Sequence, residues 1–186
     1  MKLNRVACAA MVGAVVLVAA PSASSASAPA AERHCNTRVV GVDADGNYIL
    51  TPQECYSTFD QAARAAGVRS GSKVSPTNLS AALDAPENSL VSYIAVHHDG
   101  TNYGGSSIAI QGSGCSGGGI NWATAQSGQW NNRFSSSRQY CQYGAYIRYY
   151  DSSTYSGNSY HARGWEDKPD LGSLNNLTSS VKYGGS

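Results

Sequence analysis

Charged side chains are scarce in this chain. Only 13% of its 186 residues are Asp, Glu, Lys or Arg, and the formal net charge is +1. Proteins that bind nucleic acid need a basic stripe along the phosphate backbone, so we expect no nucleic acid partner. The sequence also lacks a Cys-x-x-Cys pair and its histidines are scattered, which argues against a zinc site. Its 20 glycines and 12 tyrosines are instead typical of a turn-rich, short-stranded β protein.

The N-terminal residues 1–30 have the pattern of a secretory signal peptide. Lys2 and Arg5 precede an apolar core from Val6 to Ala20, and small residues follow from Pro21 onward. The apolar core is short for a membrane span. The small-x-small rule allows cleavage at two positions, after Ala26 or Ala30. We therefore expect a secreted, extracellular protein with no membrane attachment after signal removal, carrying 11 basic against 12 acidic residues.

Four cysteines remain in the predicted mature chain: Cys35, Cys55, Cys115 and Cys141. An even number in an exported protein indicates two disulfides, with three possible connectivities. Residues 38–42 and 48–51 flank the turn sequence 43–47 and predict a β-hairpin. This hairpin would bring Cys35 and Cys55 together. The turn sequence Asp-x-Asp-Gly-Asn lacks the closing Glu of a calcium loop, so we interpret it as a turn.

Two short helices are predicted next. Ser57 can cap a helix from Thr58 to Ala66, with Gly67 as the stop, and a second is predicted around 76–83. Neither helix is long enough to be stable alone. Residues 31–89 are therefore predicted to be a hairpin and short-helix extension that packs on a β domain in residues 90–186.

The second half of the chain contains an internal duplication. Asn-Asn-x-x-Ser-Ser occurs at 131–136 and again at 175–180. Each copy follows the pattern aromatic-x-x-x-x-Tyr-x-Gly, at His98, Tyr103 and Gly105 and then, 52 residues later, at Tyr150, Tyr155 and Gly157. A single copy would be interpreted as an Asn/Ser turn. Two copies in register indicate two repeats of strand, folded hairpin, further strands and a polar corner, whose oxygens suit calcium.

These paired motifs resemble those of the βγ-crystallins, whose Greek-key motifs carry the same hairpin followed by a calcium-binding loop. Both repeats fit, with His98 in place of Tyr, Phe or Trp as the one departure. The resemblance covers about residues 90–186. It implies a mainly β fold in which two Greek-key motifs form a β-sandwich.

The resemblance also implies two Ca²⁺ sites, each combining the polar corner of one repeat with a hairpin carbonyl of the other. Carried over by position, one site would contain Asp151 with Asn132, Arg133 and Ser135. The other would contain Asp99 with Asn176, Leu177 and Ser179. Arg133 and Leu177 can contribute only backbone oxygens.

The first repeat is eight residues longer than the second, which matches a glycine-rich loop insertion at 112–119. A disulfide between Cys115 and Cys141 would close about 26 residues and contribute about 3 kcal/mol. The stretch 114–118 also has the form Gly-x-Ser-x-Gly, the nucleophile elbow of esterases. It lacks the α/β context that this elbow needs, so we expect no enzyme.

Among βγ-crystallin-type proteins, the chain is most similar to secreted actinobacterial peptidase inhibitors. That resemblance implies a monomer that contacts an extracellular protease through a rigid exposed loop, either 112–119 or 156–165. Two alternatives stay open. One is an antimicrobial toxin or cell-wall-binding module, for which the tyrosines in 140–160 would form a carbohydrate-stacking face. The other is a calcium-stabilised extracellular structural protein.

Overall fold

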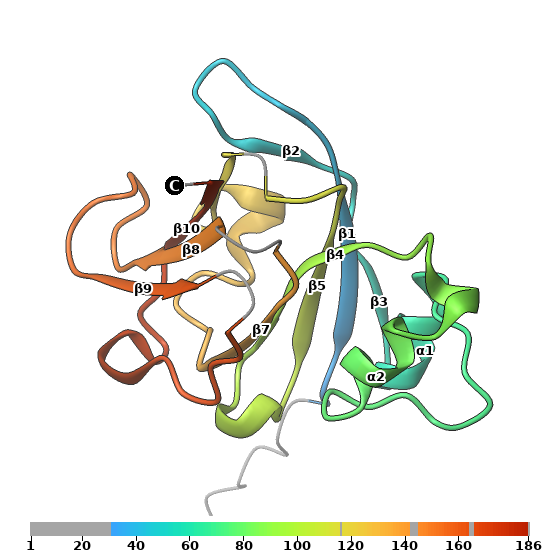
Figure 1. Cartoon of the computed structure of the whole chain (residues 1–186). Helices are drawn as coiled ribbons and strands as arrows, with labels where there is room; N and C mark the ends of the chain where they lie inside the picture. Colours follow the sequence, from blue (N-terminus) through green and yellow to red (C-terminus); the bar gives the residue numbers. More distant parts are fainter. Residues whose placement is uncertain (1–30, 116, 142–144, 164–165, 186) are drawn as a thin grey trace, which may run out of the picture. The chain divides into compact units, whose positions relative to one another are not determined.

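The computed structural model describes residues 31–186, except Ser116, 142–144, 164–165 and Ser186. Two β-sheets dominate it (Figure 1). The first sheet contains β1 (His34–Val42), β2 (Tyr48–Leu50), β3 (Glu54–Tyr56), β4 (Tyr93–His98), β5 (Ser107–Gln111) and β7 (Ser136–Gln139). The second contains β6 (Gly119–Asn121), β8 (Ala145–Tyr150), β9 (Ser159–Arg163) and β10 (Ser180–Gly185). The prediction of a mainly β, two-sheet fold is confirmed.

The two repeats exchange strands. In the first repeat, β4 pairs with both β5 and β7, but β6 pairs with β10 of the second repeat. In the second repeat, β8 lies between β9 and β10, whereas Lys168 crosses to the first sheet. There Lys168 and Ser137 of β7 exchange two backbone hydrogen bonds of 2.8 Å. Each repeat is thus a Greek-key unit that is completed by the other.

The core lies between the two sheets. Its buried side chains come from the inward-facing positions of both sheets and from the connecting segments, among them Ile94, Ile108, Trp122, Phe134, Ile147, Tyr149, Val181 and Tyr183. In β5, β8 and β10, alternating residues face this layer, as expected for strands with two different environments.

The predicted N-terminal hairpin is formed by β1 and β2. The Asp43 carboxylate closes its turn by accepting hydrogen bonds from the backbone N–H groups of Asp45 and Asn47, at 3.0 and 2.7 Å. Strand β1 also lies parallel to β5 and extends the first sheet, a pairing that the sequence did not predict. Residues 31–186 cluster as one compact unit, so the boundary at residue 89 stays a sequence prediction.

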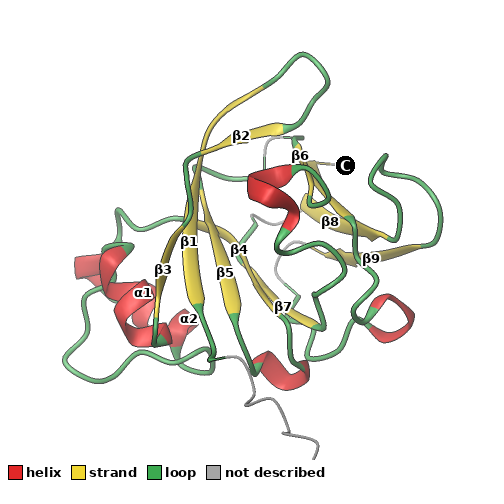
Figure 2. Cartoon of the chain, turned by 180° about the vertical axis from the view of Figure 1, so that it is seen from behind, coloured by secondary structure: helices red, strands yellow, loops and turns green. Residues whose placement is uncertain are grey.

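The helical segment lies beside β1 and β3 (Figure 2). It contains α1 (Phe59–Ala65), α2 (Leu79–Leu83) and the 3-10 turn η1 (Pro86–Asn88). Buried side chains of this segment, such as Leu79, pack on the outer face of the first sheet against Tyr93 and Val96. The predicted cap was wrong by one residue: Thr58, not Ser57, accepts the Gln61 N–H at 3.2 Å.

Further 3-10 turns occupy the connections: η2 (Thr101–Tyr103), η3 (Ala125–Gly128) and η4 (Gly172–Leu174). The predicted insertion is a loop only as far as residue 118, since β6 begins at Gly119. It packs under the hairpin, because a Cβ at Gly118 would lie 2.0 Å from the Tyr48 ring.

Both predicted disulfides form. Cys35 pairs with Cys55 across β1 and β3, with Cα atoms 4.0 Å apart, and Cys115 pairs with Cys141, with Cα atoms 5.5 Å apart. Within the described part of the chain, no helix is both long and apolar enough to span a bilayer. The predicted signal peptide, residues 1–30, lies outside the described residues.

Candidate metal sites

The two hairpins have the same backbone geometry. Tyr103 and Tyr155 have φ angles of 64° and 55°, and Gly105 and Gly157 follow with φ angles of 72° and 81°. Each glycine lies under the aspartate that opens its hairpin. A Cβ at Gly105 would be 2.1 Å from the Asp99 Oδ1 atom, and one at Gly157 would be 2.2 Å from the Asp151 Oδ1 atom. Glycine is therefore required both by φ and by the carboxylate packed against it.

His98 fills the place of the usual aromatic residue. Its ring is fully buried and meets the Tyr103 ring edge-on, with centroids 5.9 Å apart. Tyr150 and Tyr155 meet in the same way in the second repeat, at 6.3 Å. The departure from the pattern at His98 thus preserves the packing of the hairpin.

Backbone hydrogen bonds join the two polar corners. Asn132 and Asn176 have φ angles of 55° and 56°, the left-handed region that asparagine tolerates. The Asn132 N–H donates to the Thr178 carbonyl at 2.9 Å, and the Asn176 N–H donates to the Phe134 carbonyl at 2.8 Å. Each asparagine is therefore held against the corner of the opposite repeat.

The serines of each corner bind the hairpin of their own repeat. The Ser135 N–H donates to the His98 carbonyl, and the Ser179 N–H donates to the Tyr150 carbonyl, both at 2.8 Å. The next hydroxyls repeat this pattern, with Ser136 donating to Gly100 and Ser180 donating to Ser152, both at 2.6 Å. In each corner, the asparagine thus binds the opposite repeat, whereas the serines bind the hairpin of their own repeat.

The hydrogen bonds of the serine hydroxyls place the predicted ligand residues in a different grouping from the one that the resemblance implies. The Ser135 Oγ lies 2.9 Å from the Asp99 carbonyl and 3.2 Å from the Asn176 Oδ1, so Ser135 belongs with Asp99 and not with Asp151. The Ser179 Oγ lies 2.8 Å from the Asn132 Oδ1, so Ser179 belongs with Asn132 and not with Asn176. The two serines exchange places because the asparagines cross between repeats whereas the serines do not.

We name the two groups for their aspartates. The Asp99 site contains Asp99, Ser135 and Asn176, with Leu177 next in the chain. The Asp151 site contains Asp151, Ser179 and Asn132, with Arg133 next in the chain. Each site thus combines residues of both repeats.

The Asp99 site has more acceptor oxygens than protons. The Ser135 hydroxyl has a single proton to donate. With the side-chain amide oxygens of both asparagines facing it, three acceptor oxygens surround this hydroxyl: the Asp99 carbonyl, the Asn176 Oδ1 and, at 2.7 Å, the Asn175 Oδ1. Sequence reasoning missed Asn175, although the Asn-Asn doublet is present in both corners. Its counterpart Asn131 has a buried Oδ1 without a hydrogen-bond partner among the described residues.

A hard cation fits this arrangement. Neutral carbonyl, amide and hydroxyl oxygens are ligands that calcium accepts, and a cation would satisfy oxygens that share too few protons. Across the described residues, no group of three His, Cys, Asp or Glu side chains could hold a metal ion. The structure therefore offers hard, mostly neutral oxygens.

The two sites differ in charge. The Arg133 guanidinium pairs with the Asp99 carboxylate at 2.5 Å and lies over the Trp130 ring at 5.2 Å. The Asp151 carboxylate instead accepts a hydrogen bond from the neutral Asn158 amide at 2.8 Å. Leu177, at the position equivalent to Arg133, is 51% exposed. A fixed positive charge thus neutralises only the Asp99 carboxylate.

Comparison with known proteins finds similar solved structures. No family model and no curated protein matches the chain. Solved structures that it resembles include a βγ-crystallin domain from Clostridium beijerinckii, with 20% identity and a TM-score of 0.41 over 50% of this chain and 99% of that one. Another is a βγ-crystallin domain from Flavobacterium johnsoniae, with 24% identity and a TM-score of 0.38 over 50% and 96%. The N-terminal domain of protein S has 20% identity and a TM-score of 0.40 over 49% and 94%. Over about half of its length, this chain is similar in fold to βγ-crystallin domains.

Proposed function

We propose that this chain is an extracellular calcium-binding protein whose two sites brace a scaffold that inhibits a peptidase. The crowding of three acceptor oxygens around the single proton of Ser135 carries the calcium part. The two disulfides support the extracellular part, since such bonds persist in oxidising compartments.

Calcium would be held by the same chemistry in both sites. Asp99 and Asp151 would offer their hairpin carbonyls, and Ser135 and Ser179 their hydroxyl oxygens. The amide oxygens of Asn176 and Asn132 would complete the side-chain set, with backbone oxygens of Leu177 and Arg133 beside them. The ion would supply positive charge that joins the two repeats at the point where their corners meet.

Binding is expected to be weak. The proposed ligands are mostly neutral, and affinity rises with the number of charged ligands, so a dissociation constant of roughly 10⁻⁴ to 10⁻³ M is expected. Dissociation constants in this range are those of extracellular calcium-binding modules. At ten dissociation constants of free calcium, one site adds about 1.4 kcal/mol of stability.

Calorimetric titration and thermal unfolding with calcium test this part. The double variant Ser135→Ala and Ser179→Ala should lose most of the calcium-dependent rise in melting temperature. Ser173→Ala is the matched control, because Ser173 is an exposed serine in the turn before the second corner. A double variant that keeps the full rise would show that the corners are only turns.

The β1–β2 hairpin favours the inhibitor role. Tight inhibitors present a preorganised backbone, which lowers the ordering cost of binding. The hairpin turn is closed by Asp43, and its strands expose Val40 (61%), Val42 (48%) and Ile49 (49%). The loops expected from sequence are less suited, since Gly118 at the end of the first packs against Tyr48 and residues 159–163 of the second form β9.

A panel of secreted metallo-, serine and cysteine proteases, with and without calcium, tests inhibition. We expect inhibition of at least one protease, weakened modestly by removing calcium and strongly by changing Val40 and Val42 to Ser. Changing the exposed Leu90 to Ser is the control, because it removes an apolar surface residue outside the hairpin and both calcium sites. Absence of inhibition at micromolar protein, together with glycan binding or growth arrest of bacteria, would favour the toxin or wall-binding alternative.

A further inference from the structure

The outer face of the second sheet carries a row of cations. In β8 and β10 the residues Ile147, Tyr149, Val181 and Tyr183 are buried in the core, so their neighbours face outward. The strand register places Arg148 opposite His161 of β9 on one side and opposite Lys182 of β10 on the other. Arg148 and Lys182 form what we call the cationic row, and His161 lies at its end. His161 and Lys182 are exposed and Arg148 is half-buried.

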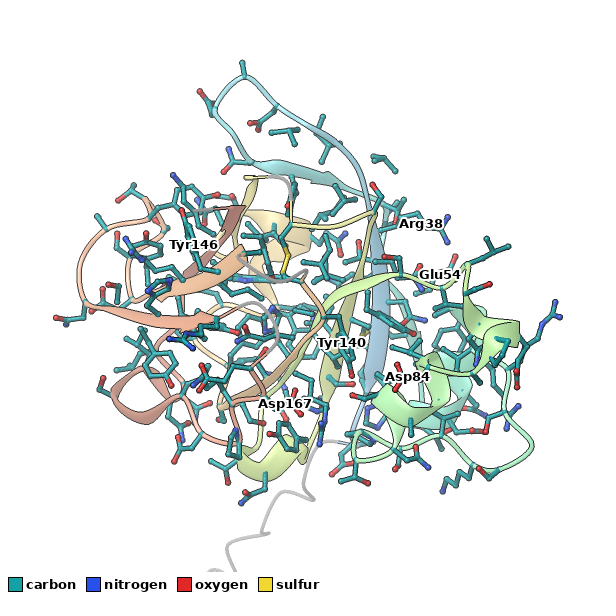
Figure 3. All side chains as sticks on the ribbon, in the orientation of Figure 1. Arg38, Glu54, Asp84, Tyr140, Tyr146 and Asp167 are labelled. Atoms are coloured by element: carbon teal, nitrogen blue, oxygen red, sulfur yellow. A yellow bond between two sulfur atoms is a disulfide. The ribbon has the colours of Figure 1, made fainter. Side chains whose placement is uncertain are left out.

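Two tyrosine rings hold the cations of the row in place. A Cβ at Gly184 would lie 2.8 Å from the Tyr146 ring, and one at Gly119 would lie 2.7 Å from the Tyr155 ring, so each ring lies on a glycine of a neighbouring strand. The Arg148 guanidinium is 5.7 Å from the centroid of Tyr146, labelled in Figure 3, and the Lys182 ammonium is 5.1 Å from that of Tyr155. Cation–π contacts of this kind hold long side chains in place.

The charges of the row are not neutralised within the described part of the chain. Arg64, Arg133, Arg138 and Lys168 each pair with a carboxylate. Arg148 and Lys182 have no such ion pair among the described residues, and the buried Arg148 Nε has no hydrogen-bond partner there. An ordered set of cations with open donors calls for an anionic ligand.

We propose that this face binds a linear polysaccharide that carries carboxylates, namely a polyuronate. Adjacent strands are about 4.8 Å apart, a spacing similar to the length of one sugar unit, so successive carboxylates can meet successive cations of the row. Arginine offers a planar fork that matches a carboxylate.

Nucleic acid fits this face less well. Single strands bind proteins largely by stacking their bases on aromatic rings. Here Tyr146 and Tyr155 have a glycine on their sheet side and a cation over the ring, which leaves no free ring for a base. The formal net charge of +1 also provides no long basic surface around the row. The proposal does not depend on calcium or on peptidase inhibition.

Binding to polygalacturonate tests the proposal, in a low-salt buffer with EDTA so that calcium cannot bridge polymer and protein. Fully methyl-esterified polygalacturonate is the matched polymer, because it has the same backbone without charge. The double variant Arg148→Gln and Lys182→Gln removes two charges from the row. Arg69→Gln with Lys73→Gln removes two exposed charges from the helical segment and is the matched control.

We expect the protein to bind polygalacturonate but not its methyl-esterified form. Added salt should weaken this binding. The row variant should lose at least about fivefold in affinity, and the control should change by less than about twofold. Lys182→Gln alone, at an exposed position, repeats the test if the double variant unfolds. Absence of binding, equal binding of the esterified polymer, equal losses in both variants, or equally tight binding of single-stranded DNA would each overturn the proposal.

Discussion

His97 and His98 end β4 on opposite faces of the first sheet. His97 lies in the core, with its Nε2 2.7 Å from the Tyr183 hydroxyl and its Nδ1 3.0 Å from the Ser137 hydroxyl. His98 lies under the helical segment, stacked on Phe59 at 6.2 Å, and neither of its ring nitrogens has a partner among the described residues. Burial lowers the pKa of both residues to about 3, from an ordinary value of 6.5. Both rings are therefore neutral in the folded state at neutral pH.

These two histidines should make the protein acid-labile. A histidine with a lowered folded-state pKa binds its proton better in the unfolded chain, so its stabilising effect is complete above pH 6.5 and is lost as pH falls toward 3. Each ring then reduces the free energy of unfolding by up to about 1.4 kcal/mol per pH unit below 6.5. Urea unfolding between pH 7 and pH 4 measures this slope. His98→Gln should make it shallower.

Arg133 should weaken the Asp99 site. Its guanidinium neutralises the Asp99 carboxylate, so Arg133→Gln removes a charge that repels a second cation. We expect calcium affinity at that site to rise by about two- to fivefold, the range for one exposed ion pair. Calorimetry on the variant measures this change. Leu177→Gln, at the equivalent position of the other repeat, should leave both affinities unchanged, and a matching rise there would refute the charge argument.

Gly105 should tolerate no side chain. Its φ of +72° is strained for alanine, and the new Cβ would meet the Asp99 carboxylate. Gly105→Ala is expected to reduce the free energy of unfolding by about 1–3 kcal/mol. Gly71→Ala is the control, since a Cβ at Gly71 would meet no described atom within 4 Å and the φ of this residue is ordinary. Urea unfolding of both variants distinguishes a local clash from a general effect of glycine replacement.

At the scale of the elements, the local patterns were predictive and the long-range pairings were not. The hairpin of β1 and β2 follows from its Asp-Gly-Asn turn, and both disulfides follow from proximity to predicted turns. The parallel pairing of β1 with β5 could not be predicted, because it joins residues about seventy positions apart, such as Cys35 and Ile108, and has no local pattern. The cap shifted to Thr58 because neighbouring Ser and Thr have similar cap propensity and packing decides between them.

The disulfide between Cys115 and Cys141 should stabilise the first repeat. It closes a separation of 26 residues that includes β6 and β7. Replacing both cysteines by Ser should lower the free energy of unfolding by about 3 kcal/mol through greater freedom of the unfolded chain. Urea unfolding compares this variant with the parent protein. Under the inhibitor proposal, the same variant should inhibit nearly as well as the parent, because the proposed contact lies on the β1–β2 hairpin.

At the scale of the whole molecule, neither repeat should fold without the other. Strand β6 pairs only with β10 among the described strands, and Ser137 of β7 pairs with Lys168 of the second repeat. A fragment of residues 31–140 should therefore show no cooperative thermal transition by circular dichroism. Residues 31–186 should show one. Cooperative unfolding of the fragment would mean that the exchanged strands are dispensable.

The same exchange limited what the sequence could say about the candidate sites. The pattern Asn-Asn-x-x-Ser-Ser identifies the residues but is the same in both repeats, so it does not say which serine meets which asparagine. The answer depends on Asn132 and Asn176 crossing to the opposite repeat while Ser135 and Ser179 stay with their own hairpins. The Arg133 to Asp99 pair joins residues 34 positions apart and likewise leaves no local signal.

The strand exchange also has a consequence for the order of events during synthesis. Ribosomes release a chain from its N-terminus, and domains fold once their last required segment has emerged. The first sheet needs Lys168 to finish the edge at β7, and β6 needs β10 (Ser180–Gly185). The native pairing of the first repeat is therefore complete only after β10 has been synthesised. Under the proposal of an extracellular protein, this late pairing leaves the chain incompletely folded until then, which is the condition that passage through a narrow export channel requires.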